Sequence, residues 1–327
     1  MKVAFRVDSN LLTGFGHFSR VINLCQTWRI IDKFVEVVFI GNYNDFAISK
    51  LKYLGLEYLY VPRDDFSELY TSLFDNYDYV LFDSYFLAQE QLQLISDLSN
   101  KTIIIDDLCN YSYHNIDYVI NFRFNANYLF SYDSKFSLLG ISYLIVSPEL
   151  VRLRESRIKN FTRKFLNVTL FFGGAFENID IIKKVIETLY NVNPSFRISL
   201  VSGLEIENYP HVTYILPNNS IEKIFEESDL IIAGGGLIKY ESAFAMIPTF
   251  SFSTNELQDE DNRLLAKENI LVDLGPFDAF SSCKFSRQIS FFLDDPKKLD
   301  FQVNNNFLLF NPDPTTYLVK SIINANE

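Results

Sequence analysis

Short apolar segments alternate with helix-like segments along most of this chain, and this alternation limits the possible folds more than any other feature. Residues 79–82 and 102–105, for example, are rich in Val, Ile, Leu and Phe, and a helix-like segment separates them. Strands of this kind are buried on both faces, as in a parallel sheet covered by helices on each side. The strands expected in the first half of the chain are residues 1–7, 34–40, 57–61, 79–82, 102–105 and 118–120.

The same alternation starts again after a basic segment. Strands are expected there at residues 167–172, 197–201, 212–215, 230–233 and 248–252. We therefore predict two α/β units of similar build, residues 1–147 and 167–327, joined by a linker at residues 148–166. A helix-like tail, residues 316–324, could cross back onto the first unit.

The linker is crowded with basic residues. We interpret it as a solvated interdomain helix or linker, and attraction of an anionic ligand is the weaker alternative. The basic residues are Arg152, Arg154, Arg157, Lys159, Arg163 and Lys164.

Composition and charge exclude several classes of partner. The net charge of −12 argues against a surface that binds nucleic acid. The three cysteines and three histidines are scattered without metal-ligand spacing, so we expect no metal site and a reducing compartment. No apolar run reaches the ~18 residues of a membrane span, and the N-terminus begins with a strand rather than a leader. We expect a cytoplasmic monomer without a cofactor or a membrane partner.

Polar residues follow several of the expected strands in the first unit. Asp8, residues 83–85, Asp106-Asp107 and Asn121 all stand at such strand ends. In parallel sheets, ligands bind beyond the carboxyl ends of the strands, so these residues are candidates for a site. The alternative is that they are ordinary turn and cap residues.

One loop in this group carries a histidine. It reads Thr13-Gly14-Phe15-Gly16-His17 and is followed by Arg20. Glycine allows a ligand to approach the backbone closely, and histidine transfers protons readily near neutral pH. The alternative is a tight turn whose histidine caps or packs the next helix.

Glycine is scarce elsewhere in the chain. There are 12 glycines, and seven of them lie in three loops after expected strands. Backbone N–H groups in such loops can face a phosphate, and the following helix adds its dipole. Glu241 follows the third loop and could accept hydrogen bonds from ribose, although it could equally be a plain helix residue. The loop glycines are Gly14, Gly16, Gly173, Gly174, Gly234, Gly235 and Gly236.

Taken together, these motifs resemble one enzyme family, the UDP-2,4-diacetamido-2,4,6-trideoxy-β-L-altropyranose hydrolases of pseudaminic acid biosynthesis, within the GT-B superfamily. The resemblance covers roughly residues 2–272. It rests on Phe5-Arg6-Val7-Asp8, Gly14-Phe15-Gly16-His17 with Arg20, Asp83-Ser84-Tyr85, Asp106-Asp107, Gly140-Ile141-Ser142-Tyr143, Phe172-Gly173-Gly174 and Ala233-Gly234-Gly235-Gly236 with Glu241.

The resemblance implies a GT-B-like fold, with two Rossmann-like domains facing across a cleft. It makes His17 the general base and gives Tyr85 the task of positioning the water or the sugar. The sugar and the catalytic loop would be supported by Asp8, Gly14, Gly16, Arg20 and Asp107. UDP would be bound by Gly173, Gly174, Gly234, Gly235, Gly236, Glu241, Asn255 and Gln258. The family's usual Asn-Gln pair is split here by Glu256 and Leu257.

The function implied is hydrolysis of a UDP-linked diacetamido-trideoxy sugar, with water attacking the anomeric carbon and inverting it. UDP is a good leaving group that loop amides can stabilise, and an imidazole with an ordinary pKa of ~6.5 is neutral enough at pH 7 to act as the base. Two alternatives stay open. An inverting glycosyltransferase would need an acceptor pocket, and a non-catalytic nucleotide-sugar-binding protein would not need His17 and Tyr85.

Overall fold

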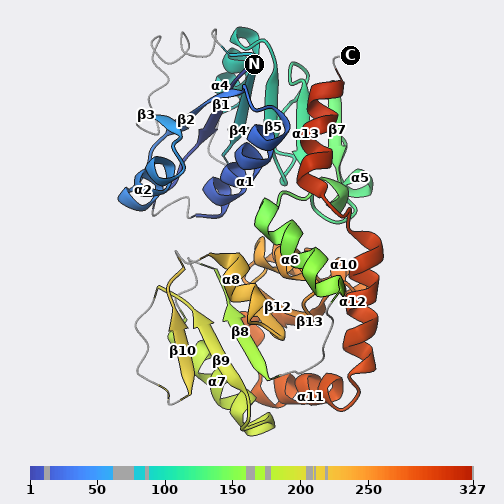
Figure 1. Ribbon diagram of the computed structural model, residues 1–327. Coiled ribbons are helices and arrows are strands. Elements are labelled where there is room, and N and C mark those ends of the chain that lie inside the picture. Colours follow the sequence, from blue (N-terminus) through green and yellow to red (C-terminus); the bar gives the residue numbers. More distant parts are fainter. Residues whose placement is uncertain are drawn as a thin grey trace. The chain divides into compact units, whose positions relative to one another are not determined.

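The chain divides into two compact units, each of the α/β class. The computed structural model describes residues 1–10, 15–61, 77–84, 88–159, 166–173, 178–203, 209, 211–217 and 220–325. One unit comprises Met1–Pro148 and Asn311–Glu327, and the other comprises Glu149–Phe310 (Figure 1). The chain therefore passes between the units twice, after residue 148 and after residue 310.

The first unit is built on a seven-stranded sheet in the order β3-β2-β1-β4-β5-β6-β7, counted over the described residues. All of its strand pairs are parallel, as predicted. The strands are β1 (Lys2–Val7), β2 (Glu36–Gly41), β3 (Glu57–Tyr60), β4 (Tyr79–Asp83), β5 (Thr102–Ile105), β6 (Tyr118–Asn121) and β7 (Phe136–Leu139). The helices are α1 (Gly16–Ile31), α2 (Asp45–Tyr53), α4 (Gln89–Leu98), α5 (Ala126–Leu129), the short η1 (Ile141–Tyr143) and α13 (Pro314–Asn324).

The second unit has a six-stranded sheet in the order β10-β9-β8-β11-β12-β13, again parallel over the described residues. Its strands are β8 (Asn167–Phe171), β9 (Arg197–Val201), β10 (Val212–Ile215), β11 (Leu230–Ala233), β12 (Thr249–Ser253) and β13 (Val272–Pro276). Its helices are α6 (Pro148–Lys159), α7 (Ile179–Val192), α8 (Ile221–Glu226), α9 (Ile238–Phe244), α10 (Glu256–Lys267), η2 (Phe277–Ala279), α11 (Ser282–Leu293) and α12 (Lys297–Leu309).

Strand order places one topological switch point in each sheet. In the first sheet the order reverses between β1 and β4, and in the second it reverses between β8 and β11. The loops that leave two neighbouring strands at a switch point turn to opposite faces, which opens a crevice at their carboxyl ends. The His17 loop follows β1, and Gly234–Gly236 follows β11. The predicted site loops therefore lie at the switch points. The sequence could not show this, because the switch points are defined by the order of the strands in each sheet.

Side-chain caps define where several helices begin. Asn44 accepts a hydrogen bond from Ala47 N at 2.9 Å at the start of α2. At the start of α7, Asn178 accepts one from Ile181 N at 3.1 Å. Asp313 caps α13, which has Pro314 in its first turn, where a missing N–H costs nothing. Asn and Asp are favoured at these positions because their side chains satisfy N–H groups that have no partner within the helix.

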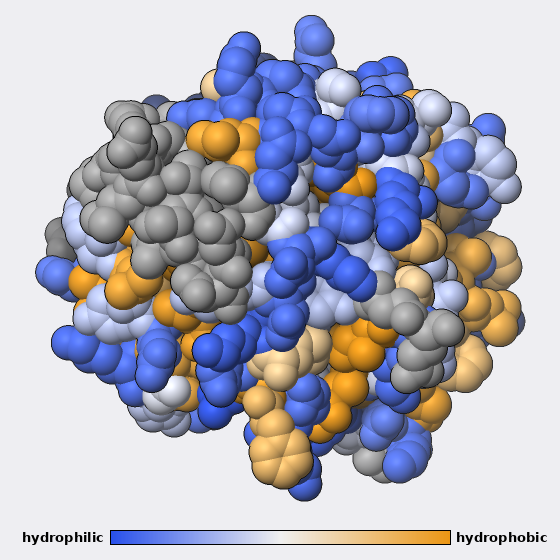
Figure 2. All heavy atoms as spheres, turned by 90° about the horizontal axis from the view of Figure 1, so that it is seen from above, coloured by the Kyte–Doolittle hydropathy of each residue, from blue (hydrophilic) through white to orange (hydrophobic). Residues whose placement is uncertain are grey.

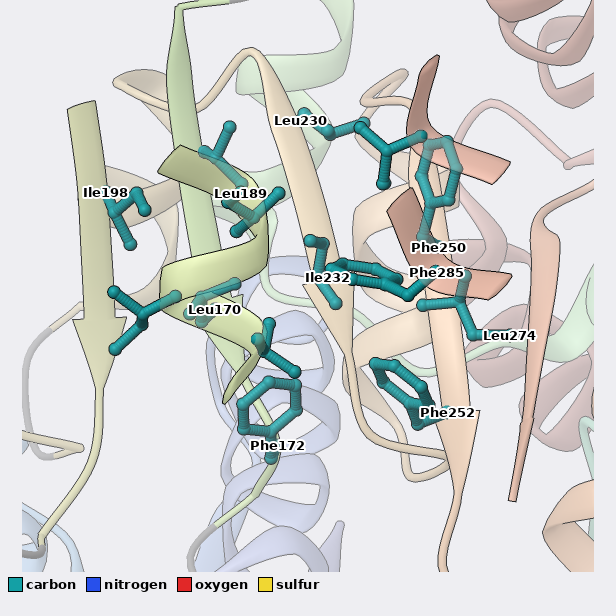
Figure 3. Close-up of a cluster of buried hydrophobic side chains, with 14 of the residues drawn as sticks. Leu170, Phe172, Leu189, Ile198, Leu230, Ile232, Phe250, Phe252, Leu274 and Phe285 are labelled. Atoms are coloured by element: carbon teal, nitrogen blue, oxygen red, sulfur yellow. The ribbon is translucent and has the colours of Figure 1, made fainter. Parts of the chain in front are cut away.

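The core of the second unit is a continuous apolar layer. Leu170, Ile232 and Phe250 from the sheet are fully or almost fully buried, and they pack with Leu189 of α7 and Phe285 of α11 (Figure 3). Sheet positions of this kind contribute about 1.5–3 kcal/mol each on burial. The layer takes alternate residues from β8 and β12, such as Leu170 and Phe250, whereas β11 is apolar throughout. In contrast, the face drawn in Figure 2 is mostly hydrophilic, with apolar residues in separate groups.

The basic segment is only partly the solvated helix or linker that we expected, because Arg152 and Lys159 are exposed but Arg154 is buried. Arg163 and Lys164 lie outside the described residues. Residues 148–159 form α6, and Arg154 is only 2% exposed. Its guanidinium donates to the carbonyl oxygens of Phe244, Asn306 and Phe307, at the ends of α9 and α12. Burial lowers the pKa of Arg154 to about 10. Arg157 donates to Phe225 O at 2.6 Å and to Ser228 O at 2.7 Å, and so closes the end of α8.

The last helix belongs to the first unit. Thr315 Oγ1 accepts from Val146 N at 2.8 Å and donates to Val146 O at 2.9 Å. Tyr118 of β6 donates through its hydroxyl to Ile322 O at 3.2 Å. Strands β7 and β13 and helices α11 and α12 were not anticipated from the sequence. For α11 a signal was present, because Phe285, Ile289 and Phe292 follow the helical period and pack in the core.

Candidate functional site

A histidine, an arginine and an aspartate meet at the switch point of the first sheet. His17 lies in the first turn of α1, Arg20 follows one turn later, and Asp83 is the last residue of β4. His17 Nδ1 is 2.6 Å from Asp83 Oδ1. Arg20 binds the same carboxylate through both nitrogens of its fork, with Nε 2.6 Å from Oδ2 and Nη2 2.5 Å from Oδ1. Such two-point pairing fixes the carboxylate in orientation as well as in position.

Asp83 is ionised in this arrangement. Burial on its own raises the pKa of Asp83, but the positive charge of Arg20 and the contact with His17 outweigh it and lower the pKa to about 2. An ionised carboxylate can only accept hydrogen bonds, so the proton of the 2.6 Å contact belongs to His17 Nδ1. An imidazole that carries one proton, on Nδ1, has its lone pair on Nε2. The His17 side chain is 16% exposed, whereas that of Asp83 is fully buried.

Asp8 lies at the same edge of the sheet, but its carboxylate accepts hydrogen bonds from other groups. Oδ1 of Asp8 accepts from Arg6 Nη1 and, at 2.8 Å, from the backbone N–H of Asn42. A Cβ on Gly41 would meet Val7 O at 2.1 Å, so the backbones of β1 and β2 come very close here. Asp8 therefore holds the ends of these two strands together, in keeping with a supporting rather than a catalytic part.

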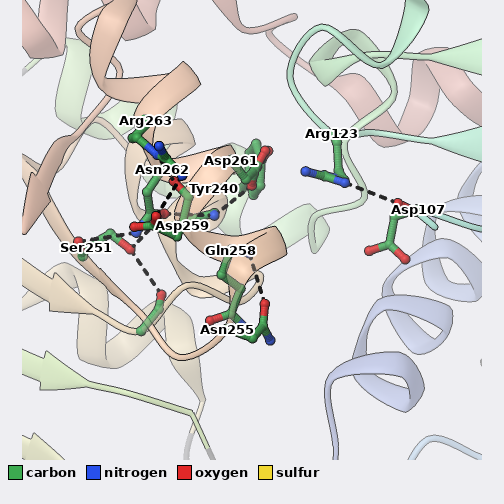
Figure 4. A network of polar contacts seen from close by, with 12 residues as sticks. Asp107, Arg123, Tyr240, Ser251, Asn255, Gln258, Asp259, Asp261, Asn262 and Arg263 are labelled. Carbon is green, nitrogen blue, oxygen red and sulfur yellow. Dashed lines mark hydrogen bonds and ion pairs between the residues drawn. The ribbon is translucent and has the colours of Figure 1, made fainter. Parts of the chain in front are cut away.

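The Asp106-Asp107 pair follows β5, and its two side chains differ. Asp106 is buried; its carboxylate accepts from the hydroxyl of Tyr113 and, at 2.9 Å, from Leu108 N. Burial raises the pKa of Asp106. Asp107 is half-buried, and its backbone carbonyl accepts from Arg123 Nη1 at 3.3 Å (Figure 4).

Three predicted residues, Tyr85, Gly14 and Gly174, lie outside the described residues. Their assigned parts stay predictions. Gly16 is the first residue of α1, and a Cβ there would meet nothing within 4 Å.

In the second unit, the glycine loop after β11 is tightly enclosed at two of its three positions. A Cβ on Gly234 would lie 2.4 Å from Phe172 O, and one on Gly235 would lie 2.4 Å from Gln258 Oε1. Gly236 is exposed, and a Cβ there would meet nothing within 4 Å. Among the described residues, the N–H groups of Gly236 and Leu237 donate to no protein acceptor. Gly173, after β8, has a φ of +92°, a conformation that favours glycine.

The carboxamides of Asn255 and Gln258 border this loop. Asn255 caps α10 by accepting from Gln258 N at 3.0 Å. Gln258 Oε1 accepts from the backbone N–H and the hydroxyl of Thr254, at 3.0 and 2.7 Å. The side-chain oxygens of Asn255 and Gln258 are therefore both used within residues 254–258, where α10 begins (Figure 4). What each side chain can offer a ligand is its NH₂ group, which donates to no acceptor in the described part of the chain.

Glu241 lies in α9, after the glycine loop, and is 5% exposed. Burial, with a smaller contribution from the charge of Glu222, raises the pKa of Glu241 to about 8. Its carboxylate has no hydrogen-bond partner among the described residues. A buried carboxyl without a partner costs free energy, which a ligand hydroxyl could recover.

The sequence prediction missed a buried polar network beside this loop. Lys239 is 1% exposed, and its Nζ lies 2.6 Å from Asp261 Oδ2 and 2.9 Å from Asn262 Oδ1. Asp83 was expected at the site but not as the partner of His17. The one available signal for the network was a lysine within the largely apolar segment 237–247, which also contains Glu241 and Ser242.

The described residues contain no group of three or more His, Cys, Asp or Glu side chains that could hold a metal ion. They also contain no helix that is long and apolar enough to cross a membrane.

Comparisons with known proteins bear on the fold. The sequence matches no known protein-family profile. A curated relative, Uncharacterized protein MJ1062 of Methanocaldococcus jannaschii, is 24% identical over 282 residues, which cover 80% of this chain and 57% of the relative. The chain thus spans little more than half the length of that relative.

Solved structures resemble the chain over almost its full length. MurG of Acinetobacter baumannii has a TM-score of 0.67 at 14% identity, with 99% of this chain and 100% of MurG covered. The spinosyn forosaminyltransferase SpnP has a TM-score of 0.67 at 13% identity and 99% coverage of both chains. UDP-GlcNAc 2-epimerase of Neisseria meningitidis, solved with UDP-GlcNAc, has a TM-score of 0.66 at 13% identity, covering 100% and 99%. The chain therefore has a GT-B-like fold.

Proposed function

We propose that this protein is an enzyme that hydrolyses a UDP-linked diacetamido-trideoxy sugar to the free sugar and UDP. The observation that carries this proposal is the His17–Asp83–Arg20 cluster. In this cluster the carboxylate of Asp83 keeps the His17 proton on Nδ1, which makes Nε2 the nitrogen that would act as the general base. The resemblance of the sequence motifs to the pseudaminic acid hydrolases supplies the substrate class.

The reaction follows from the groups in each unit. A water molecule attacks the anomeric carbon and gives its proton to His17 Nε2, while Tyr85 helps to position the water. The bond from the anomeric carbon to UDP breaks, and its electron pair leaves on the phosphate oxygen. The N–H groups of Gly236 and Leu237, which have no acceptor among the described residues, would stabilise that charge, and Glu241 would accept hydrogen bonds from the ribose. Attack on the face opposite UDP inverts the anomeric centre.

The solved structures give independent support for the ligand class. The Neisseria meningitidis epimerase was crystallised with UDP-GlcNAc, and SpnP is named as a sugar transferase. The same likeness favours the second candidate, an inverting glycosyltransferase that uses a UDP-sugar donor. Both reactions place a base beside the anomeric carbon, and they differ in whether water or an acceptor hydroxyl attacks.

The test is turnover in water alone. The purified protein is mixed with UDP-diacetamido-trideoxy sugars, and UDP and free sugar are followed by NMR without any acceptor. Release of both, with the anomer first formed inverted, supports hydrolysis. UDP release only after addition of an acceptor sugar would establish the transferase instead. Tight UDP-sugar binding without turnover under either condition would show a non-catalytic binding protein.

A further inference from the structure

The buried network around Lys239 ties together two helices that border the glycine loop. Lys239 and Tyr240 belong to α9, which begins two residues after Gly236. Asp261 and Asn262 belong to α10. Lys239 Nζ bonds to both α10 residues, and the Tyr240 hydroxyl lies 2.8 and 2.9 Å from the two oxygens of Asp261 (Figure 4). The first turn of α9 is thus fixed to the middle of α10.

The network also reaches the loop backbone. Ser251 Oγ, on β12, lies 3.3 Å from both Asn262 Oδ1 and Gly234 O and 3.2 Å from Phe252 O, and its single proton is shared among these acceptors. Asn262 Nδ2 donates in return to Ser251 O at 3.3 Å. A continuous set of contacts therefore runs from the Lys239 ammonium, through Asn262 and Ser251, to the carbonyl of the first glycine in the loop.

The position of α10 matters to the loop because Gln258 lies one turn before Asn262. The Gln258 side chain occupies the space beside Gly235 that a Cβ would need. Any shift between α9 and α10 would change the spacing between the Gln258 NH₂ group and the loop N–H groups. These are the donors that the proposed function assigns to the diphosphate.

An ion pair this deeply buried is a poor source of stability. Lys239 and Asp261 are 1% and 4% exposed, and removing two charges from water costs more than many such pairs return. An apolar pair of similar size would hold the helices together as well. What an apolar pair cannot supply is the directed N–H donors that orient Asn262 and, through it, the loop.

We propose that Lys239 and Asp261 are positioning residues that set the glycine loop and the Gln258 amide in register for a diphosphate ligand. The inference rests on the proposed function for the identity of that ligand. The charges themselves neutralise one another, so the pair acts by geometry rather than by attracting the phosphate.

The test uses the double variant Lys239→Met/Asp261→Leu, because it leaves no unpaired buried charge and is expected to fold. Lys267→Met, on the exposed surface of α10, is the matched control. UDP affinity is measured by calorimetry, and amide hydrogen exchange is measured across residues 233–238. We expect the double variant to bind UDP about tenfold more weakly. We also expect its loop amides to exchange about tenfold faster, with a melting temperature close to that of the unaltered protein.

The two measurements separate the two proposals. Unchanged exchange of the loop amides in a folded double variant would overturn the positioning inference, whatever the ligand. Faster exchange with unchanged UDP affinity would also overturn it. If the unaltered protein does not bind UDP, the proposed function fails. The hydrogen-exchange measurement by itself then shows whether the Lys239–Asp261 network fixes the loop. Should the double variant not fold, Asn262→Asp, which keeps size and Oδ1, provides the same two readouts.

Discussion

The carboxylate of Asp83 lies 2.6 Å from Nδ1 of His17 and accepts hydrogen bonds from Nε and Nη2 of Arg20. The aspartate therefore does two things for the imidazole: it selects the tautomer with the proton on Nδ1, and it fixes the ring plane. Arg20 keeps the buried carboxylate charged, which both effects require. Support of this kind, from a group that does not itself touch the substrate, is a common way to raise the efficiency of a catalytic histidine.

Replacing His17 by Ala should lower the rate of UDP release by about 100-fold or more, because the proposed mechanism gives the proton of the attacking water to His17. UDP binding should persist, since the residues proposed to bind UDP belong to the second unit. Turnover is measured by NMR and binding by calorimetry. His114→Ala, at an exposed position, serves as the control and should retain full activity. Full activity of the His17 variant would refute the mechanism.

Replacing Asp83 by Asn should lower turnover by about 10- to 100-fold without abolishing UDP binding, because the ring loses its fixed tautomer. The change should also alter acid stability. The pKa of Asp83, about 2, is below its value in the unfolded chain, so the carboxylate stabilises the fold above about pH 4. That contribution, about 2 kcal/mol, is lost as the pH falls through 2. Urea unfolding from pH 6 to pH 2 checks this: the gap between the two proteins should narrow with acid.

Glu241→Gln should weaken UDP binding about tenfold and stabilise the empty protein at high pH. The pKa of Glu241 is raised by burial to about 8, above its value in the unfolded chain. Ionisation therefore penalises the fold progressively as the pH rises from about 4 to about 8, and Gln removes this penalty. Melting temperatures at pH 5 and pH 9 test the stability part, and the Gln variant should gain much more at pH 9 than at pH 5.

If ribose hydroxyls donate to an ionised Glu241, then UDP binding at pH 7 should release a proton. Calorimetry in buffers with different ionisation enthalpies measures that release. An apparent binding enthalpy that is the same in every buffer would remove the ribose assignment from Glu241.

Gly235→Ala and Gly236→Ala form a matched pair. The new methyl group at residue 235 would meet Gln258, whereas at residue 236 it would meet nothing within 4 Å. We expect the first variant to bind UDP about tenfold more weakly and the second to bind within about threefold of the unaltered protein. Because the obstacle at residue 235 is a flexible side chain, adding Gln258→Ala should relieve the steric clash and raise the melting temperature of Gly235→Ala. Equal affinities in the two single variants would show that the loop does not hold the ligand.

The sequence alone determined the fold class and the position of the loops. Apolar strands such as residues 102–105 can be recognised locally because a strand in a covered parallel sheet is apolar on both faces. Glycines that are rare elsewhere and cluster after strands mark loops in the same local way. The alternation, the restart after residue 166 and the three glycine loops are all short-range patterns.

Only the tertiary structure decided which side chains meet. His17 and Asp83 are 66 residues apart, and they come together because β4 pairs with β1 rather than with β3. Lys239 and Asn262, 23 residues apart, meet because α9 and α10 both pack near β12. Arg154 is buried because its guanidinium donates hydrogen bonds to backbone carbonyls near the ends of two helices, α9 and α12. Strand order and packing depend on the free energy of the whole chain, so no local pattern of residues specifies these pairs.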